Sequence, residues 1–288
     1  MSRKYTPFFI KRRSIILNTP SLYLNPHLVP ESSISKSSIY TIGEQWQLMF
    51  EQYWGIKIQR LDIEPTILNI NVFSPYYTCT SSSRQAELDA CVKWNSNIPG
   101  IKLFLITDKS SNIVHTENVT ILRRSKNGRI KYQEILEFIR KYTLDNEINC
   151  IINSDIILDK NFTKKLRLSP RDCLCLTRHE VYVEKIDLSN ILSLNVETVV
   201  KKLVENPASQ DLWLFTGHVN DVVLDFYMGI PGCDNLTSLE FYNKGYRLLN
   251  LAKLQRIYHI HSNTNNISSY PFTYFLLPEF KLCNIEIE

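Results

Sequence analysis

The chain has 288 residues, of which 44% are hydrophobic and 22% charged, the composition of an ordinary globular protein. Its net charge of +4 is too small to predict nucleic-acid binding by itself. No apolar stretch approaches the roughly 20 residues that a membrane-spanning helix needs. Lys11, Arg12 and Arg13 interrupt the apolar N-terminal stretch before a signal-peptide core forms, so a cytoplasmic location is expected. The seven cysteines, an odd number, fit free thiols in a reducing compartment.

Residues 1–66 differ from the rest of the chain. They contain Pro7, Pro20, Pro26 and Pro30 and the serine-rich stretch "ESSISKSSIY". They predict one helix, at about 42–54, with aromatic residues at helical spacing. We expect an irregular or helical N-terminal extension or small subdomain. Its aromatic face either packs on the main body or forms a platform for an acceptor.

Residues 67–288 are expected to form the main domain, because strand and helix patterns alternate from residue 67 onward. Apolar runs predict strands at 66–74, 101–108, 118–124 and 148–156, and helical periodicity predicts helices at 83–95 and 128–143. Further along, valines at helical spacing predict a helix at 195–206, and Asp234 and Asn235 are expected to cap another that runs to Lys244. Short apolar strands separated by helices indicate an α/β fold with a mostly parallel sheet flanked by helices.

The apolar run 148–152 ends in Asn153, Ser154 and Asp155, and a second apolar run begins at Ile156. In a parallel sheet this position is the carboxyl edge, where ligands bind. Three interpretations are open for Asp155: a cap or turn residue, a ligand for a divalent metal that holds a diphosphate, and a general acid or base.

Several blocks resemble the GT-A glycosyltransferases, which use nucleotide sugars. The strand that ends in "NSDI" is similar to their metal-binding aspartate motif, and "YYTCTSSSRQAELDACVKWN" resembles the entry of such domains. The segments "SQDLWLF", "GIPGCDN" and "IYHIHS" resemble later blocks of a GT-A-like group, some members of which are linked to glucosylation of DNA bases. The resemblance covers about residues 67–265 and implies a Rossmann-like GT-A fold. It departs from the usual Asp-x-Asp motif at Asn153, which carries no charge.

The resemblance implies Mn²⁺ or Mg²⁺ as cofactor, with Asp155 and His261 as its protein ligands. His261 is preferred over His259, for which hydrogen bonding at a sheet edge is expected. Asp234 is the first candidate for the base that deprotonates the acceptor, and Asp211 is the second; a helix cap and a structural carboxylate are the respective alternatives.

Contacts to the nucleotide sugar are expected from residues at the start of this domain and from the polar turn. Arg84 opens a helix whose N-terminus favours anions, although a surface ion pair is the alternative. Tyr76 and Tyr77 are candidates for stacking on the base, or for packing at the rim. The full set of candidate donor contacts is Tyr76, Tyr77, Arg84, Asn153 and Ser154.

The sequence therefore predicts a transferase that moves a sugar from a nucleotide sugar, with a UDP-sugar favoured, to an unidentified acceptor. A glucosyltransferase for a modified DNA base and an inactive nucleotide-sugar-binding or scaffold protein remain alternatives. A nucleotidyltransferase lacks support because no glycine-rich phosphate loop follows the first strand, and the alternating fold fits a glycosidase less well. The basic N-terminal cluster is either a solvated tail or a contact for an anionic polymer such as DNA; its residues are Arg3, Lys4, Lys11, Arg12 and Arg13.

Overall fold

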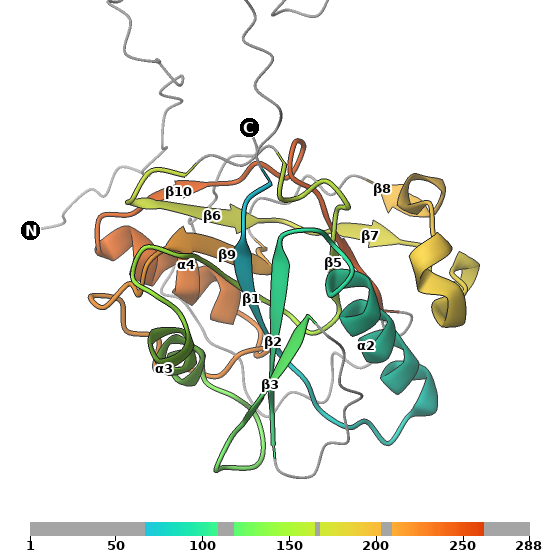
Figure 1. Cartoon of the computed structure of the whole chain (residues 1–288), viewed down its shortest axis with the longest axis horizontal. Coiled ribbons are helices and arrows are strands. Elements are labelled where there is room, and N and C mark those ends of the chain that lie inside the picture. The colour runs from blue at the N-terminus through green and yellow to red at the C-terminus, as the bar shows by residue number, and fades with distance from the viewer. Residues whose placement is uncertain (1–66, 109–117, 165–167, 203–208, 262–288) are drawn as a thin grey trace, which may run out of the picture. The chain divides into compact units, whose positions relative to one another are not determined.

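The computed structural model describes residues 67–108, 118–164, 168–202 and 209–261. The predicted N-terminal extension, its helix at about 42–54 and the basic cluster lie outside these ranges. Within them, three α-helices and two β-sheets form an α/β domain (Figure 1). The expected α/β class is confirmed.

The larger sheet has seven strands in the order β10-β6-β9-β4-β1-β2-β3. Strands β1, β2, β3 and β4 are parallel neighbours, as predicted, whereas β9 runs antiparallel between β4 and β6. The sheet is therefore mostly parallel. Its strands are β1 (Ile70–Pro75), β2 (Ile101–Thr107), β3 (Val119–Arg123), β4 (Ile148–Ile152), β6 (Asp172–Leu176), β9 (Leu212–Thr216) and β10 (Arg247–Leu249).

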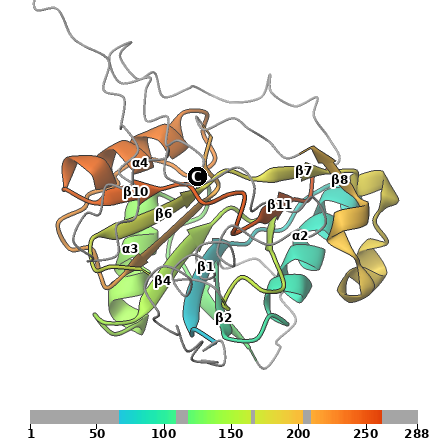
Figure 2. The same ribbon diagram turned by 90° about the horizontal axis from the view of Figure 1, so that it is seen from above.

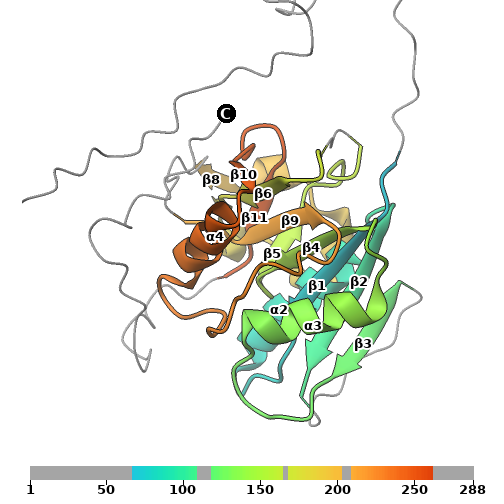
Figure 3. The ribbon, with the colours of Figure 1, turned by 90° about the vertical axis from the view of Figure 1, so that its left-hand side faces the viewer.

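Helices cover both faces of this sheet because alternate residues of each strand point to opposite sides. Helix α2 (Ser82–Asn95) packs on one face with Val72, Leu103 and Ile152. Helices α3 (Tyr132–Tyr142) and α4 (Cys233–Asn243) pack on the other (Figure 2), and Figure 3 shows α3 lying across that face.

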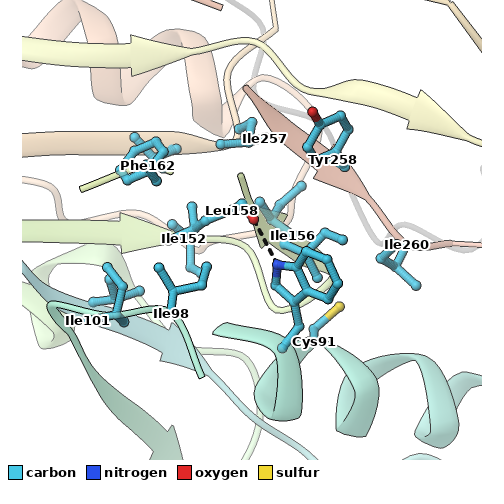
Figure 4. Packing of buried hydrophobic residues seen from close by; sticks show 14 of the residues in the cluster. Cys91, Ile98, Ile101, Ile152, Ile156, Leu158, Phe162, Ile257, Tyr258 and Ile260 are labelled. Carbon is cyan, nitrogen blue, oxygen red and sulfur yellow. Dashed lines mark hydrogen bonds between the residues drawn. The ribbon is translucent and has the colours of Figure 1, made fainter. Parts of the chain in front are cut away.

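A second sheet, of four short strands, was not foreseen from the sequence. Its order is β5-β11-β7-β8, and it joins the same hydrophobic core as α2. Figure 4 shows Ile156 and Leu158 of β5 packed near Cys91 of α2 and Ile152 of β4. The strands are β5 (Ile156–Leu158), β7 (His179–Val181), β8 (Val200–Lys202) and β11 (Ile257–His259).

The helix expected at 195–206 is wrong over the part that the structure describes. Residues Val196–Thr198 form a single 3₁₀ turn, and the described residues before it include 3₁₀ segments at Val183–Lys185 and Leu188–Ser193. The chain then enters β8, where Val200 pairs with Val181. Several β-branched residues in this segment explain the outcome, because they favour strands and restrict side-chain rotamers in helices.

Helix α4 begins earlier than expected. Its N-cap is Gly232, with φ at +88°, so Asp234 and Asn235 lie inside the first turn rather than at the cap. Glycine suits this position because a left-handed backbone carries no side-chain penalty there. The end is close to the prediction, since Lys244 is the C-cap.

Candidate functional site

The polar turn at residues 153–155 is the point where the chain leaves one sheet for the other. Strand β4 ends at Ile152 in the large sheet, and β5 begins at Ile156 in the small one. The turn is closed by a hydrogen bond from the Ile156 amide to the Asn153 carbonyl, 3.3 Å. Asp155 therefore lies at the carboxyl edge of the parallel strands, as the sequence predicts, because the chain crosses here between two buried strands.

Helix α2 holds β5 in place through its last turn. The Asn95 side chain donates to the Ile156 carbonyl at 2.8 Å and accepts from the Leu158 amide at 3.0 Å, so it pairs with the strand as a neighbouring strand would. The indole Nε1 of Trp94 donates to the Leu158 carbonyl at 2.7 Å. These three buried bonds fix the strand that begins directly after Asp155.

Strand β11 brings the histidines to this turn. It lies between β5 and β7, and His259 stands opposite Ile156 on one side and Glu180 on the other. The Ile260 amide donates to the Asp155 carbonyl at 2.8 Å, which continues the pairing past the end of the strand. Residues more than 100 positions apart in sequence thus meet through strand pairing.

Asp155, His259 and His261 form a cluster in which one ligand atom of each lies within 4.8 Å of the others. The Nε2 atom of His259 is 3.3 Å from Asp155 Oδ2, and the two imidazole rings are 5.4 Å apart between centroids. One carboxylate and two imidazoles are a donor set that suits Mn²⁺ better than Mg²⁺, which prefers oxygen ligands. The residues present therefore fit a divalent cation.

Arg84 lies in the first turn of α2 and also contacts the cluster. Its Nη2 is 2.6 Å from Asp155 Oδ2, and its Nη1 is 2.8 Å from Glu87, a carboxylate only 2% exposed. Nη1 also lies 3.4 Å from the Ile260 carbonyl. The structure thus shows Arg84 in an ion pair, one of the two interpretations that the sequence allowed. Its partner is Asp155, the candidate metal ligand.

The charges of the cluster stabilise one another. Burial disfavours ionisation of Asp155, but the hydrogen bond with His259 and the charge of Arg84 outweigh it and lower the pKa of that carboxyl below its usual range. Burial opposes protonation of His259, yet hydrogen bonds to Asp155 and Glu180 raise its pKa to about 9. For His261, burial and the nearby Arg84 lower the pKa. In the metal-free protein, Asp155 is therefore ionised and His259 carries its proton at neutral pH.

A second carboxylate, Asp211, is joined to the same turn. Its Oδ1 accepts from Asn153 Nδ2 at 2.6 Å and from Arg178 Nη1 at 2.9 Å, while its Oδ2 is buried with no partner among the described residues. The Asn153 amide also donates to the Asp211 carbonyl at 3.2 Å. Asn153 thus orders Asp211 in this structure.

Asp234, in the first turn of α4, lies near Asp211. Its Oδ2 accepts from the Gln210 amide at 3.4 Å, and burial together with the charge of Asp211 raises its pKa. A carboxyl with a raised pKa is better suited to take a proton than an ordinary one. The neighbouring Asn235 Oδ1 is another buried acceptor without a partner among the described residues.

The two tyrosines after β1 occupy different environments. Tyr76 is 7% exposed and packs in the core next to α2, and its hydroxyl donates to Asp89 at 2.5 Å. Tyr77 is 43% exposed, which leaves its ring available to a ligand. Ser154 lies between Asn153 and Asp155 and is partly exposed.

The sequence did not identify three members of this network as site residues. For His259 the sequence predicts only sheet-edge hydrogen bonds, and Glu180 and Arg178 are not among the predicted site residues. The sequence did carry one signal for these residues. In "RHEV" and in "IYHIH", two titratable residues stand two positions apart, so in a strand their side chains point to the same face. Alternation alone does not show which strands are neighbours, so pairing of β7 with β11 was needed.

No protein-family model matches the chain, and no curated protein matches it in sequence. Among solved structures, it is similar to a mannosyltransferase from Pyrobaculum calidifontis in complex with GDP-mannose and Mn²⁺, at 16% identity and a TM-score of 0.39. That match covers 65% of this chain and 55% of the other, so the chain spans little more than half of that protein.

It is also similar to the catalytic domain of a Drosophila β1,4-galactosyltransferase 7, solved with xylobiose, and to a mutant of that enzyme with manganese, UDP-galactose and xylobiose. Both match at 9% identity and a TM-score of 0.39, over 68% of this chain and 72% of theirs. These neighbours are glycosyltransferases of the GT-A type. At such low identity and TM-score, the likeness assigns no role to the residues of the site.

Proposed function

We propose that the chain is a glycosyltransferase that takes a nucleotide-sugar donor and uses a divalent cation. The observation that carries this proposal is the Asp155–His259–His261 cluster at the carboxyl edge of a mostly parallel sheet. Ligands of α/β folds bind at this edge. The resemblance of the "NSDI" block to the GT-A metal motif supports the same assignment.

Transfer of the sugar breaks the bond between its anomeric carbon and the diphosphate and forms a bond to an acceptor oxygen. Negative charge develops on the leaving diphosphate, and a divalent cation, when bound, neutralises it as a Lewis acid. Asp155, His259 and His261 would hold that cation. Arg84, which already lies against Asp155, would supply a second positive charge at the same place.

The acceptor hydroxyl must lose a proton as the new bond forms. Asp234 is the first candidate for the base, because burial and the nearby Asp211 raise its pKa. Asp211 is the second candidate. Its unpartnered Oδ2 is available to accept a hydrogen bond from an acceptor or sugar hydroxyl. Tyr77 and Ser154 remain candidate donor contacts.

The test is release of nucleoside diphosphate from a panel of UDP- and GDP-sugars by the full chain, with Mn²⁺, Mg²⁺ or a chelator. We expect slow, Mn²⁺-dependent release even without acceptor, because water substitutes for the acceptor hydroxyl. Failure to release any diphosphate, together with an unchanged unfolding temperature in the presence of donor, would refute the proposal. Donor binding without release would instead identify a nucleotide-sugar-binding protein.

The acceptor is open, and a hydroxyl on a modified DNA base is one alternative that the resemblance raises. It is tested by adding duplex DNA with or without hydroxymethylated bases to the same reaction. Faster donor consumption with the hydroxymethylated duplex alone would support a DNA-base acceptor. Equal rates of donor consumption with both duplexes would exclude a hydroxymethylated DNA base as the acceptor.

A further inference from the structure

Glu180 contacts His259 on the side opposite to Asp155. The two residues are direct partners in the parallel pairing of β7 with β11, and both Glu180 carboxylate oxygens lie near His259 Nδ1, at 3.2 and 3.0 Å. The other ring nitrogen, Nε2, faces Asp155 at 3.3 Å. The imidazole is therefore held between two carboxylates, one at each nitrogen.

We propose that Glu180 is a positioning residue for the cation site, and that it acts by fixing the orientation of the His259 ring. The inference rests on the proposed function, since it assigns a role within the same site. A carboxylate at Nδ1 keeps the N–H on that nitrogen and leaves the Nε2 lone pair directed at the cation. Without it, the ring is free to rotate about its side-chain bonds.

Arg178 extends this arrangement to the acceptor side. Its Nε donates to Glu180 at 2.8 Å, and its Nη1 donates to Asp211 at 2.9 Å. Asp211 in turn binds Asn153, which belongs to the same turn as Asp155. Five side-chain contacts therefore link six residues in series, and the two end residues belong to the same turn: Asn153, Asp211, Arg178, Glu180, His259 and Asp155.

This series of contacts has a consequence for the site. A displacement of Glu180 releases His259 on one side and Arg178 on the other, so one substitution loosens both the cation ligands and Asp211.

The experiment measures binding of Mn²⁺ alone to the full chain by electron paramagnetic resonance, in wild type, Glu180→Ala, Glu180→Gln and Glu184→Ala. Glu184 is an exposed carboxylate four residues further on, and it serves as the matched control. We expect Glu180→Ala to weaken Mn²⁺ binding about 10-fold to 100-fold, the range for loss of an outer carboxylate partner of a metal-bound histidine. The Mn²⁺ affinity of Glu180→Gln should lie between those of Glu180→Ala and wild type, because the amide oxygen of glutamine still accepts the hydrogen bond from His259 Nδ1–H.

A spectroscopic signature separates positioning from general destabilisation. Spin-echo modulation of bound Mn²⁺ should show two histidine nitrogens in wild type and a weakened or missing second coupling in Glu180→Ala. If Glu180→Ala fails to fold, Glu180→Gln carries the same comparison.

The outcomes distinguish the positioning role of Glu180 from the cation site itself. Equal Mn²⁺ affinity and unchanged nitrogen couplings in wild type and the Glu180 variants would overturn the positioning role and leave the proposed glycosyl transfer in place. An equal loss in Glu184→Ala would also overturn it. Absence of Mn²⁺ binding by the wild type would overturn the cation site itself and this inference with it.

Discussion

Replacing Asp155 with alanine should abolish donor turnover and leave the chain folded. The substitution removes the carboxylate that contacts Arg84 at 2.6 Å and His259 at 3.3 Å. Breaking a buried ion pair costs about 3–5 kcal/mol when it leaves one charge without a partner. Here each cation keeps a second acid, Glu87 for Arg84 and Glu180 for His259. We therefore expect a smaller loss in the free energy of unfolding, about 1–2 kcal/mol.

The effect on turnover should be much larger. Asp155 is the one carboxylate of the cation cluster, and its loss leaves only the two imidazoles as ligands. A bound cation contributes several kcal/mol to stabilisation of the leaving group, and a loss of about 4 kcal/mol corresponds to a rate reduction of about 10³-fold.

The assay is Mn²⁺-dependent release of nucleoside diphosphate, run beside thermal unfolding of each variant. Asp159→Asn is the matched control, because this carboxylate directly follows the other end of β5, where it accepts from the Asn161 amide at 2.8 Å. Turnover by Asp155→Ala within about tenfold of wild type would refute the assignment of this residue. So would an equal loss in the control.

The remaining predictions concern stability. Trp94→Phe removes the donor to the buried Leu158 carbonyl and should lower the free energy of unfolding by about 1–3 kcal/mol in chemical denaturation; no change would show that the bond does not hold β5. Gly232→Ala places a side chain at φ +88° and should cost about 1–3 kcal/mol, seen as a lower unfolding temperature. Burial disfavours ionisation of Asp172, but hydrogen bonds led by that from Arg247 lower its pKa below the ordinary 3.8, so its contribution to stability is present above about pH 4 and is lost as the pH falls. Arg247→Met should raise the pH of acid unfolding, and an identical acid transition would contradict this account.

Much of the large sheet was predictable from local pattern. The apolar runs at 101–108 and 118–124 correspond to β2 and β3, and the helix expected at 128–143 contains α3. Parallel order followed from the alternation of strand and helix, which also placed Asp155 at the carboxyl edge. These features depend on residues close together in the chain, so composition and periodicity were enough.

The segment at 195–206 shows where local pattern failed. Its valines have helical spacing, yet Val200 pairs with Val181 in the small sheet. Over a short length, a run of β-branched residues fits both the helical and the strand periodicity. Pairing with a neighbouring strand, rather than the segment itself, then decides between helix and strand. The same limit applied to the small sheet as a whole, because its strands are only three residues long.

For the site, the sequence alone determined the chemistry that was available: a carboxylate at a sheet edge and a pair of histidines in alternation near the end of the domain. Only the tertiary structure decided which of them meet. Strand β11 lies between β5 and β7, and this pairing sets His259 between Asp155 and Glu180. The side chain of Arg178 donates to both Glu180 and Asp211 and so joins Asp211 to them. The physical reason is that, apart from the Arg178–Glu180 pair, these contacts link residues 33 to 104 positions apart, which no local preference encodes.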